Sequence, residues 1–447
     1  MEFNEIRSRF VNYYTECGFE LLPRAPMMHP SIPMSFVMSA GLVQVETSLA
    51  NAQNRSGNKF VLVQDCFRHF DLDAVGTDDI HLSLFEMPGA FVFGNNGKQD
   101  TIKNMWQLAT KRLGIDPNRI WASYFAGGTI GDQQLPEDKL ARQTWLDLGL
   151  PDSRVIGLGI DHNYWVQGGG IQTNGKELRK CGPNTELFFD RGKQLSCGTT
   201  CQPGCRCGRF IEFANSLFIS YKLHPETDIL ILMDDPFNET VIGTERVAMI
   251  LQDVDSVFDT KNYRLIIDVI HQFANCKNLP RNLIITSERV IADYLRALFV
   301  LVADGAPPPG KNGRERIVKL LVRGVLTRQI ILGIKPQDFF SLIIASTRKI
   351  FVNSNLDALQ IERKLYAYFE NESRRFLKTV EHGRREMELL LTKNQGKTLS
   401  ELQILSLEKK RGLPHLLTDM ILREKGLIFA EKGYNQALAM WRQGAHS

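Results

Sequence analysis

Residues 62–94, LVQDCFRHFDLDAVGTDDIHLSLFEMPGAFVFG, are the stretch that decides the fold. A β-type run at 60–63 leads into this stretch, and Arg68 lies just past that run. A polar loop rich in Gly and Asp, 71–79, joins the first run to a second one at 81–94. Two such runs predict an antiparallel hairpin with one fixed cation near its base. A surface hairpin with an ordinary solvated arginine fits the same residues equally well.

The composition is that of an ordinary globular protein. The chain has 447 residues, of which 43% are hydrophobic and 23% are charged, so two or three packed units are expected. A net charge of +4 is too small by itself to indicate a nucleic-acid partner. The placement of the charges therefore has to decide that question.

Three features predict a cytoplasmic protein without a membrane segment. No apolar run approaches the roughly 20 residues that span a bilayer. The start of the chain is charged and helical, unlike a signal peptide. The eight cysteines are too few for a disulfide scaffold, which favours a reducing compartment.

The order of helical and β-type segments predicts an α+β fold. An amphipathic helix over 4–17 precedes strands that pair antiparallel, which argues against a doubly wound parallel sheet. Further strands are expected at 119–126, 154–158, 210–220 and 228–233, and further helices at 101–113 and 138–148.

The pattern becomes helical beyond residue 255, and we expect a domain boundary there. Ser287 is predicted to cap a helix that ends at Ala303. Further helices are expected over 314–328, 357–391 and 413–441. The prediction is thus an antiparallel-sheet domain over 1–255, followed by an all-α domain over 256–447.

Four cysteines lie close together in a loop over 197–207. Their spacing is Cys197-x3-Cys201-x3-Cys205-x-Cys207, with Gly, Thr and Pro between them. Thiols this close can surround one tetrahedral ion, and zinc suits thiolates that have no redox task. A zinc ion held by all four would have no open position and would be structural. Free or redox-active thiols are the alternative.

Two other cationic features each have a functional and a structural interpretation. Arg246 follows a strand, a Gly and Glu245 at the start of a helix, which places it near a pocket rim unless it pairs with Glu245. The helix over 314–328 has five basic residues and one acid, with Arg316, Lys319 and Arg323 on one face. That face is either a solvated surface or a ridge that contacts phosphates.

Together these segments resemble the alanyl-tRNA synthetase family of class II aminoacyl-tRNA synthetases, nearly from end to end. QDCFRHFDLDAVGTDDIHLSLFEMPGAFVFG resembles motif 2 of that class, and GTERVAMILQ resembles motif 3. EIRSRFVNYYTECGFELLPRAP, CGPNTELFFD and RFIEFANSLF resemble the first helix and strand and the later core strands. RVIADYLRALFVLVADGAPPPG, RERIVKLLVRGVLTR and LPHLLTDMILREKGL resemble the helical domain that holds the tRNA acceptor stem. None of the nine histidines has the H-x3-H spacing of an editing site.

This resemblance implies a two-step reaction that uses ATP and Mg²⁺. A small amino acid is activated to an aminoacyl adenylate and is then transferred to the 3′ end of tRNA. Arg68 would hold the α-phosphate and the carboxylate, and Arg246 the far phosphates, because the planar guanidinium meets two oxygens at once. The other implied contacts are Phe85, Met87 and Phe91 to the adenine, Trp165, Asn215, Glu239 and Val241 to the amino acid, and Arg314, Arg316, Lys319 and Arg323 to the tRNA.

Three departures from the family pattern concern the amino-acid pocket. Glu239 stands where the family has an aspartate that grips the α-amino group, so a carboxylate remains but reaches further. Val241 replaces a glycine and removes room, whereas Ala214 replaces a tryptophan and adds room. A reshaped pocket is expected, with activation retained and alanine favoured. Because self-association in the family commonly involves parts beyond the end of this sequence, a monomer is expected.

Two other functions remain open. A synthetase-derived enzyme would form the adenylate but pass the aminoacyl group to a small molecule or carrier, and it would need no basic ridge. A catalytically inactive paralogue would only bind RNA or a partner, although the presence of both motif arginines argues against it. Amino-acid-dependent exchange between ATP and pyrophosphate excludes the inactive paralogue.

Overall fold

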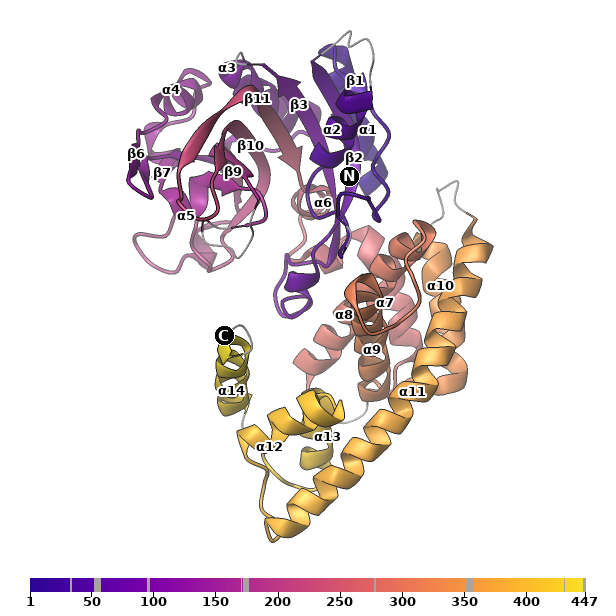
Figure 1. The fold of residues 1–447 in the computed structure, drawn as a ribbon. Helices are drawn as coiled ribbons and strands as arrows, with labels where there is room; N and C mark the ends of the chain where they lie inside the picture. Colours follow the sequence, from indigo (N-terminus) through magenta and orange to yellow (C-terminus); the bar gives the residue numbers. More distant parts are fainter. Residues whose placement is uncertain are drawn as a thin grey trace. The chain divides into compact units, whose positions relative to one another are not determined.

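A computed structural model shows two compact units (Figure 1). It describes residues 1–32, 34–51, 58–94, 97–169, 171, 177–276, 279–350, 357–429 and 431–444. The first unit consists of Met1–Ser31, Val37–Phe67 and Phe85–Asn262. The second consists of Ile32–Phe36, Arg68–Leu84 and Tyr263–Ser447. The connection inside the predicted hairpin is therefore part of the second unit.

The first unit is built on a nine-stranded sheet with the order β1-β2-β3-β11-β10-β9-β4-β7, to which β8 adds by pairing with β9. The pairs from β3/β11 to β9/β4 are antiparallel, while β1/β2 and β4/β7 are parallel. The strands are β1 Glu20–Leu21, β2 Lys59–Phe67, β3 Leu84–Phe93, β4 Ile120–Phe125, β7 Val155–Leu158, β8 Tyr164–Val166, β9 Arg179–Asp190, β10 Phe210–Leu223 and β11 Leu230–Ile242. A separate pair is formed by β5 Gly128–Ile130 and β6 Gln133–Leu135. The predicted α+β class is confirmed.

Helices pack against this sheet within the first unit (Figure 1). They are α1 Phe3–Glu16, α2 Leu42–Asn51, α3 Lys98–Gln107, α4 Lys139–Asp147, α5 Ile160–Asn163 and α6 Thr244–Leu251. The apolar stripe predicted for the first helix is buried, with Ile6 and Phe10 at 0% exposure. On α3, Met105 is equally buried and its Sδ accepts a hydrogen bond from Ser216 Oγ of β10 at 3.2 Å. Helix α3 thus covers the face of the sheet on which Ser216 lies, whereas Leu42 and Val45 of α2 pack on the opposite face with Phe91 and Leu217.

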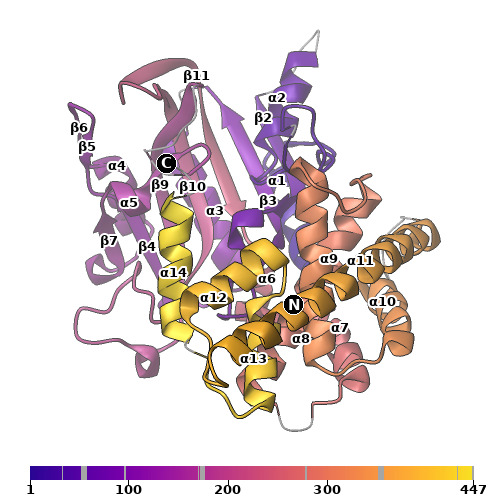
Figure 2. The same cartoon turned by 60° about the horizontal axis from the view of Figure 1, so that its bottom comes forward.

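The second unit is helical, as predicted (Figure 2). Its helices are α7 Lys261–Phe273, α8 Arg281–Ala303, α9 Gly313–Ile331, α10 Pro336–Ile350, α11 Ala358–Lys393, α12 Glu401–Ser406, α13 His415–Glu424 and α14 Glu431–Gly444. The prediction that Ser287 caps a helix is wrong. Helix α8 begins at Arg281, because Pro280 has extended backbone and its carbonyl accepts hydrogen bonds from the N–H groups of Leu283 and Ile284. Ser287 therefore lies inside the helix, where it is fully buried.

The connection between β2 and β3 is anchored to α8 within the second unit. Ser83 N–H donates to Asp293 Oδ2 at 3.0 Å, and Tyr294 OH donates to the Leu72 carbonyl at 3.0 Å. Asp293 is fully buried, and burial raises the pKa of its carboxyl to about 6. A solvated surface loop would not place its backbone against a buried carboxyl group.

Among the residues that the structure describes, no helix is long and apolar enough to cross a membrane.

Candidate active site

The central strands place most of the predicted amino-acid-binding residues on one face of the sheet. Residues directly opposite each other on paired strands point to the same face. The first such row is Gly89, Val241, Asn215 and Glu186, and the second is Phe91, Glu239, Leu217 and Asn184. We call these eight residues the central rows. The structure thus brings together Phe91, Asn215, Glu239 and Val241, which come from the three strands β3, β10 and β11.

Glu239 is the most unusual residue of the central rows. Its side chain is buried at 4% exposure, between Phe91 of β3 and Leu217 of β10. Burial alone raises the pKa of its carboxyl from 4.5 to about 8. Ionisation of a buried carboxyl group costs free energy, and a cation that binds beside the carboxylate reduces this cost. The site is therefore suited to a positively charged ligand group.

Beside Glu239, the central rows contain a small hydrogen-bonded polar network. Asn215 Nδ2 donates to Glu186 Oε1 at 2.9 Å, and Asn184 Nδ2 donates to Asn215 Oδ1 and Glu186 Oε1, each at 3.1 Å. Burial, assisted by the negative charge of Glu212, raises the pKa of Glu186 well above its usual range. Sequence reasoning missed Asn184 and Glu186, although their position in CGPNTELFFD was a signal that could have found them.

Strand β3 positions the residues predicted for the adenine site. Phe85, Met87 and Phe91 alternate along the strand, so they share one face. Gly89 lies between them, and a Cβ there would come within 3.1 Å of the Phe91 ring and 3.2 Å of the Ala40 carbonyl oxygen. A side chain at this position would therefore need the Phe91 ring or the Ala40 backbone to move by a few tenths of an ångström. Phe85 and Met87 are only partly buried, so their side chains remain accessible to a ligand.

Trp165 and Ala214 have different relations to the central rows. Trp165 lies on β8 opposite Gly182 and packs against the apolar cluster that includes Phe91. Ala214 pairs with Leu187 and Ile242, which lie on the opposite face of the sheet from Asn215. The expectation that Ala214 adds room beside Asn215 is wrong, because neighbouring residues of a strand alternate between faces. Val241 is the departure that borders the site.

Helix α6 holds Arg246 through contacts of its first turn. Glu245 accepts the Glu86 N–H at 3.0 Å, and Thr244 Oγ1 donates to Glu86 Oε1 at 2.8 Å. These contacts fasten the start of α6 to β3. The described partner of Arg246 is Glu212 rather than its neighbour Glu245: its Nη1 donates to the Glu212 carbonyl at 3.0 Å and to Oε2 at 3.2 Å.

Glu86 joins β3 to helices α1 and α6 on the face of the sheet that these helices cover. It is 6% exposed and forms an ion pair with Arg7 Nε of α1 at 2.8 Å. Burial raises the pKa of Glu86 to about 7, against the opposing effect of Arg7. Glu86 alternates with Phe85 and Met87, so it lies on the helix-covered face while those two side chains face the other way.

Arg68 lies at the start of the anchored connection. It follows β2 with extended backbone, and its N–H donates to the Ser83 carbonyl at 2.8 Å. This hydrogen bond fixes the arginine's backbone across the base of the connection. Arg68 is part of the second compact unit, whereas Glu239 and Arg246 are part of the first.

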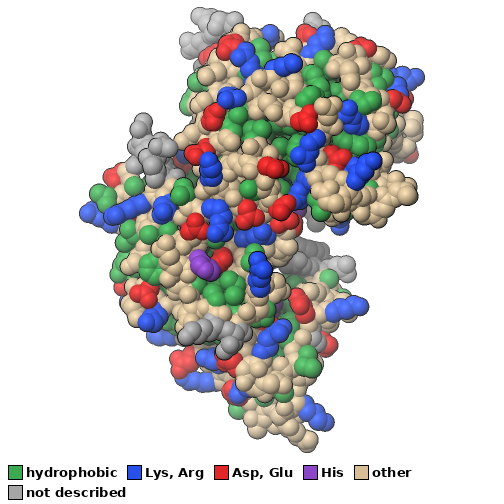
Figure 3. Space-filling model, turned by 180° about the vertical axis from the view of Figure 1, so that it is seen from behind, with side chains coloured by type: hydrophobic (Ala, Val, Ile, Leu, Met, Phe, Trp, Pro, Cys, Tyr) green, Lys and Arg blue, Asp and Glu red, His purple; other side chains and the backbone are tan. Residues whose placement is uncertain are grey.

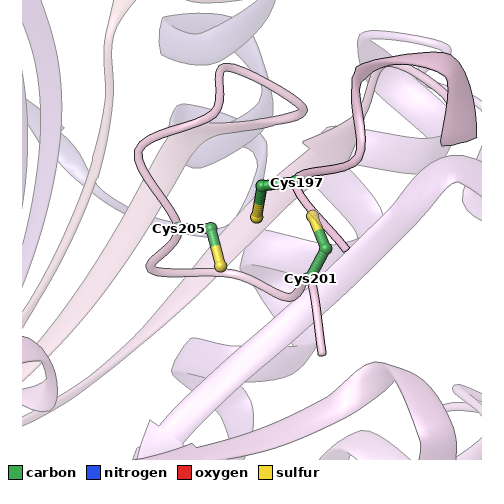
Figure 4. A group of neighbouring side chains, drawn as sticks. All are labelled: Cys197, Cys201 and Cys205. Carbon is green, nitrogen blue, oxygen red and sulfur yellow. The ribbon is translucent and has the colours of Figure 1, made fainter. Parts of the chain in front are cut away.

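The cysteine loop runs from β9 to β10 and clusters its thiols (Figure 4). The Sγ atoms of Cys197, Cys201 and Cys205 lie within 4.8 Å of one another, and that of Cys207 is 3.6 Å from Cys201. A tetrahedral zinc with Zn–S bonds of about 2.3 Å requires S–S separations of about 3.8 Å. The base of the loop is closed by Arg209, which forms a bidentate pair with Asp190 at 2.8 and 2.6 Å. The donor type and spacing therefore fit a metal ion.

Helix α9 divides the four predicted tRNA contacts into two pairs. Arg314 Nε donates to the Ser35 carbonyl at 2.7 Å, and Arg323 Nε pairs with the buried Glu372 at 2.6 Å. Both therefore hold the second unit together. Arg316 is exposed, and burial together with the charge of Arg323 lowers the pKa of Lys319. Among the described residues, Arg316 and Lys319 are thus the pair of predicted tRNA contacts that is less involved in hydrogen bonds within the unit, and they are the better candidates for binding a ligand.

Surface charge gives little further guidance. On the face drawn in Figure 3, Lys and Arg side chains are interspersed with Asp and Glu side chains. This mixture agrees with the small net charge of +4. Long-range attraction of an anionic polymer is therefore weak, and binding has to rely on local cations.

Comparison with known proteins identifies the class. The family model described as tRNA synthetases class II (A) matches residues 5–447. The chain therefore belongs to this family of class II tRNA synthetases, and the resemblance found in the sequence is confirmed.

The curated relatives are alanine–tRNA ligases. That of Leptospira biflexa is 29% identical over 443 residues, which cover 97% of this chain and 46% of the ligase. That of Thermoanaerobacter sp. (strain X514) is 29% identical over 452 residues, which cover 99% of this chain and 49% of the ligase. The chain thus spans about half the length of the curated relatives it matches.

Proposed function

We propose that the protein activates a small amino acid with ATP and transfers the aminoacyl group to the 3′ end of tRNA. The observation that carries this proposal is Glu239, a buried carboxyl whose pKa is raised to about 8 by burial alone. A bound α-ammonium would favour the ionised form of this carboxyl, which burial disfavours. A hydrogen bond between a carboxylate and an ammonium is also stronger than one between neutral groups. Membership of the class II synthetases supplies the reaction in which such an ammonium takes part.

Other residues matched to the family motifs divide the remaining work of activation. The attack of the amino-acid carboxylate on the α-phosphate spreads negative charge over phosphoryl oxygens, which fixed cations stabilise. Arg68 would bind the α-phosphate and carboxylate, and Arg246 the departing phosphates. Phe85 and Met87 would contact the adenine, and Phe91, which is fully buried, would support them from within the sheet. No covalent protein nucleophile is needed, so positioning contributes much of the rate.

Mg²⁺ would be held by oxygen donors near Arg246. Mg²⁺ prefers carboxylate and carbonyl oxygens, and it supplies charge neutralisation to the phosphates when bound. Glu186 and Glu212 lie close enough for the charge of Glu212 to raise the pKa of Glu186, and Asn215 is bonded to Glu186. This set of hard donors fits the ion.

Val241 would restrict the amino-acid side chain. It is 5% exposed and lies in the same row as Asn215 and Gly89. Two methyl groups at this position favour a small substrate, and the curated relatives make alanine the first choice. A hydrophobic pocket distinguishes one methylene only about 10- to 200-fold, so closely related amino acids would also be activated.

The direct test is ATP–pyrophosphate exchange with the purified protein and a panel of amino acids. The proposal predicts exchange that depends on a small amino acid, with alanine strongest. Exchange with no amino acid in the panel would refute activation. Exchange without acylation of any tRNA from the host would refute only the proposed acceptor.

The acceptor is tested by reversing the charges of Arg316 and Lys319. Arg316→Glu with Lys319→Glu is expected to weaken tRNA binding by at least about tenfold and to lower the salt slope by about two, since two phosphate contacts are lost. Binding is measured by fluorescence anisotropy across a salt series. Exchange without tRNA is expected to stay at the wild-type rate.

A matched control carries the same change of charge elsewhere. Lys139→Glu with Lys193→Glu alters two exposed lysines of the first unit and is expected to leave the salt slope unchanged. Equal loss of binding in both double variants would show that only overall charge matters.

A second acceptor is favoured by the internal use of two of the four predicted contacts. Because Arg314 and Arg323 bind within the second unit, only Arg316 and Lys319 of the four predicted contacts have no such hydrogen bond among the described residues of that unit. An enzyme that passes the aminoacyl group to a small molecule or carrier would retain product formation in the Arg316/Lys319 variant.

We propose structural zinc in the cysteine loop. Metal analysis is expected to find about one zinc per chain in the wild type and less than about half in Cys201→Ser with Cys205→Ser. Loss of zinc is expected to lower the melting temperature by about 2–4 °C for each kcal/mol of lost stability. Cys276→Ser, outside the loop, is the control and is expected to keep the ion. A wild-type protein without zinc, unaffected by chelators, would contradict the proposal.

A further inference from the structure

Two large apolar side chains are exposed beside the basic start of α9 in the second unit. Phe70 lies in the connection after β2 and is 63% exposed, and Met34 in the segment Ile32–Phe36 is 64% exposed. Isolated apolar residues on a surface need no explanation, but these two accompany a group of cations. Met34 lies against Gly313 at the start of α9, and we call Phe70, Met34 and the residues that join them to α9 the Phe70 platform.

Hydrogen bonds hold the Phe70 platform in place within the second unit. The ring of His69 is in edge contact with that of Phe70, at 5.8 Å between centroids. His69 Nδ1 is 3.2 Å from Ser35 Oγ, and the Ser35 carbonyl accepts from Arg314 Nε at 2.7 Å. Phe70 is therefore connected to α9 through the His69 ring and both the hydroxyl and the backbone carbonyl of Ser35.

The start of α9 brings cations to this surface: Arg314 is bound to the Ser35 carbonyl, and Arg316 lies two residues further along the helix. The charge of Arg316, after burial, contributes to the lowered pKa of His69. The charges of Arg316 and Lys311 contribute to the lowered pKa of Lys319. These cations are opposed locally by Asp71, which raises the pKa of His69. The surface therefore combines an exposed aromatic ring with several nearby cations and an acid.

We propose that Phe70 is a stacking platform for an unpaired base at the 3′ end of the RNA substrate. Aromatic rings stack on bases of any sequence, and neighbouring cations follow the phosphates, which is how proteins bind single strands. Arg316 and Lys319 would contact phosphates, and Phe70 would orient the end that receives the aminoacyl group. This inference rests on the proposed tRNA acceptor. Phe70 would be a positioning residue, not a catalytic one.

The test compares two hairpin RNAs that share one stem. One RNA has a short unpaired 3′ extension that contains a fluorescent adenine analogue, and the other is blunt. The wild type is expected to change the analogue's fluorescence and to bind the extended RNA more tightly. Phe70→Ala is expected to lose the fluorescence change and to bind the extended RNA about fivefold or more weakly, with unchanged binding of the blunt RNA. Phe70→Trp is expected to retain both signals.

The outcomes separate this inference from the proposed function. Wild-type exchange without binding of either RNA would overturn both the tRNA acceptor and the platform. Binding of both RNAs that is the same in wild type and Phe70→Ala would overturn the platform alone. Because Phe70 is exposed, its replacement is expected to leave the melting temperature unchanged, and a fall in that temperature would instead assign Phe70 a packing role.

Discussion

Arg246→Ala is expected to reduce kcat/KM for ATP in amino-acid-dependent exchange by about 100- to 1,000-fold, the loss typical of one fixed group that stabilises developing charge. Its Nη1 is bound to Glu212, which fixes the direction of the guanidinium. Arg246→Lys is expected to recover little, since an ammonium cannot reproduce two parallel hydrogen bonds. Exchange measured over a range of ATP concentrations gives the comparison, and Arg68→Ala is expected to act in the same direction.

The control for Arg246 is another arginine of the first unit that forms an ion pair. Arg142 pairs with Asp152 at 2.6 Å on the surface, and Arg142→Ala is expected to leave exchange unchanged. Loss of the Arg246 hydrogen bonds costs about 1 kcal/mol of stability each, so melting curves distinguish a folding defect from a catalytic one. A well-folded Arg246→Ala protein with wild-type exchange would exclude a role for this arginine in activation.

Glu239→Gln is expected to raise KM for the amino acid by about 30-fold or more, because truncating one partner of a buried charge pair costs about 2–5 kcal/mol. The amide keeps the size of the carboxyl group but cannot carry its charge. Glu239→Asp is expected to be milder, because it keeps the carboxylate and shortens its reach. Exchange measured over amino-acid concentration checks both, and a Gln variant with the wild-type KM would exclude the ammonium contact.

The same residue predicts a pH dependence. The pKa of Glu239 is about 8 without ligand, so below that pH the carboxyl is protonated and must lose its proton to pair with an ammonium. The affinity for the amino acid is therefore expected to rise about tenfold per pH unit towards pH 8 and then to level. Glu239→Gln removes this slope. A wild-type affinity that is independent of pH between 6 and 8 would contradict the assignment.

Stability is expected to change in the opposite direction. The unfolded carboxyl titrates near 4.5 and the folded one near 8, so between these values the folded protein holds a proton that the unfolded chain has released. The contribution of this carboxyl to the free energy of unfolding is largest below pH 4.5, falls as the pH rises from 4.5 to about 8, and is constant above pH 8. Glu239→Gln avoids that loss and is expected to melt no lower than wild type at pH 8, which shows that its raised KM does not come from misfolding.

Local sequence patterns predicted much of the fold because alternation and helical periodicity reflect which side chains are buried. They located the hairpin strands, the first helix with its buried stripe and the helical second unit. They failed at Ser287 because Pro280 starts α8 earlier, and at Ala214 because strand register decides which face a side chain takes. The alternative in which Arg246 pairs with Glu245 could not be judged from the sequence, because it depends on tertiary contacts. In the structure Glu245 accepts a hydrogen bond from the backbone of β3, and Arg246 pairs with Glu212.

The sequence by itself determined the family and the α+β class and named the residues of the candidate site, because motif residues and periodicity are local properties of the chain. Only the tertiary structure decided which of them share a surface. Pairing of β3, β11, β10 and β9 aligns Phe91, Glu239, Leu217 and Asn184, and burial there gives Glu239 its raised pKa. Register and burial arise from contacts between distant segments, so no local pattern could place Glu186 beside Asn215 or Glu212 beside Arg246.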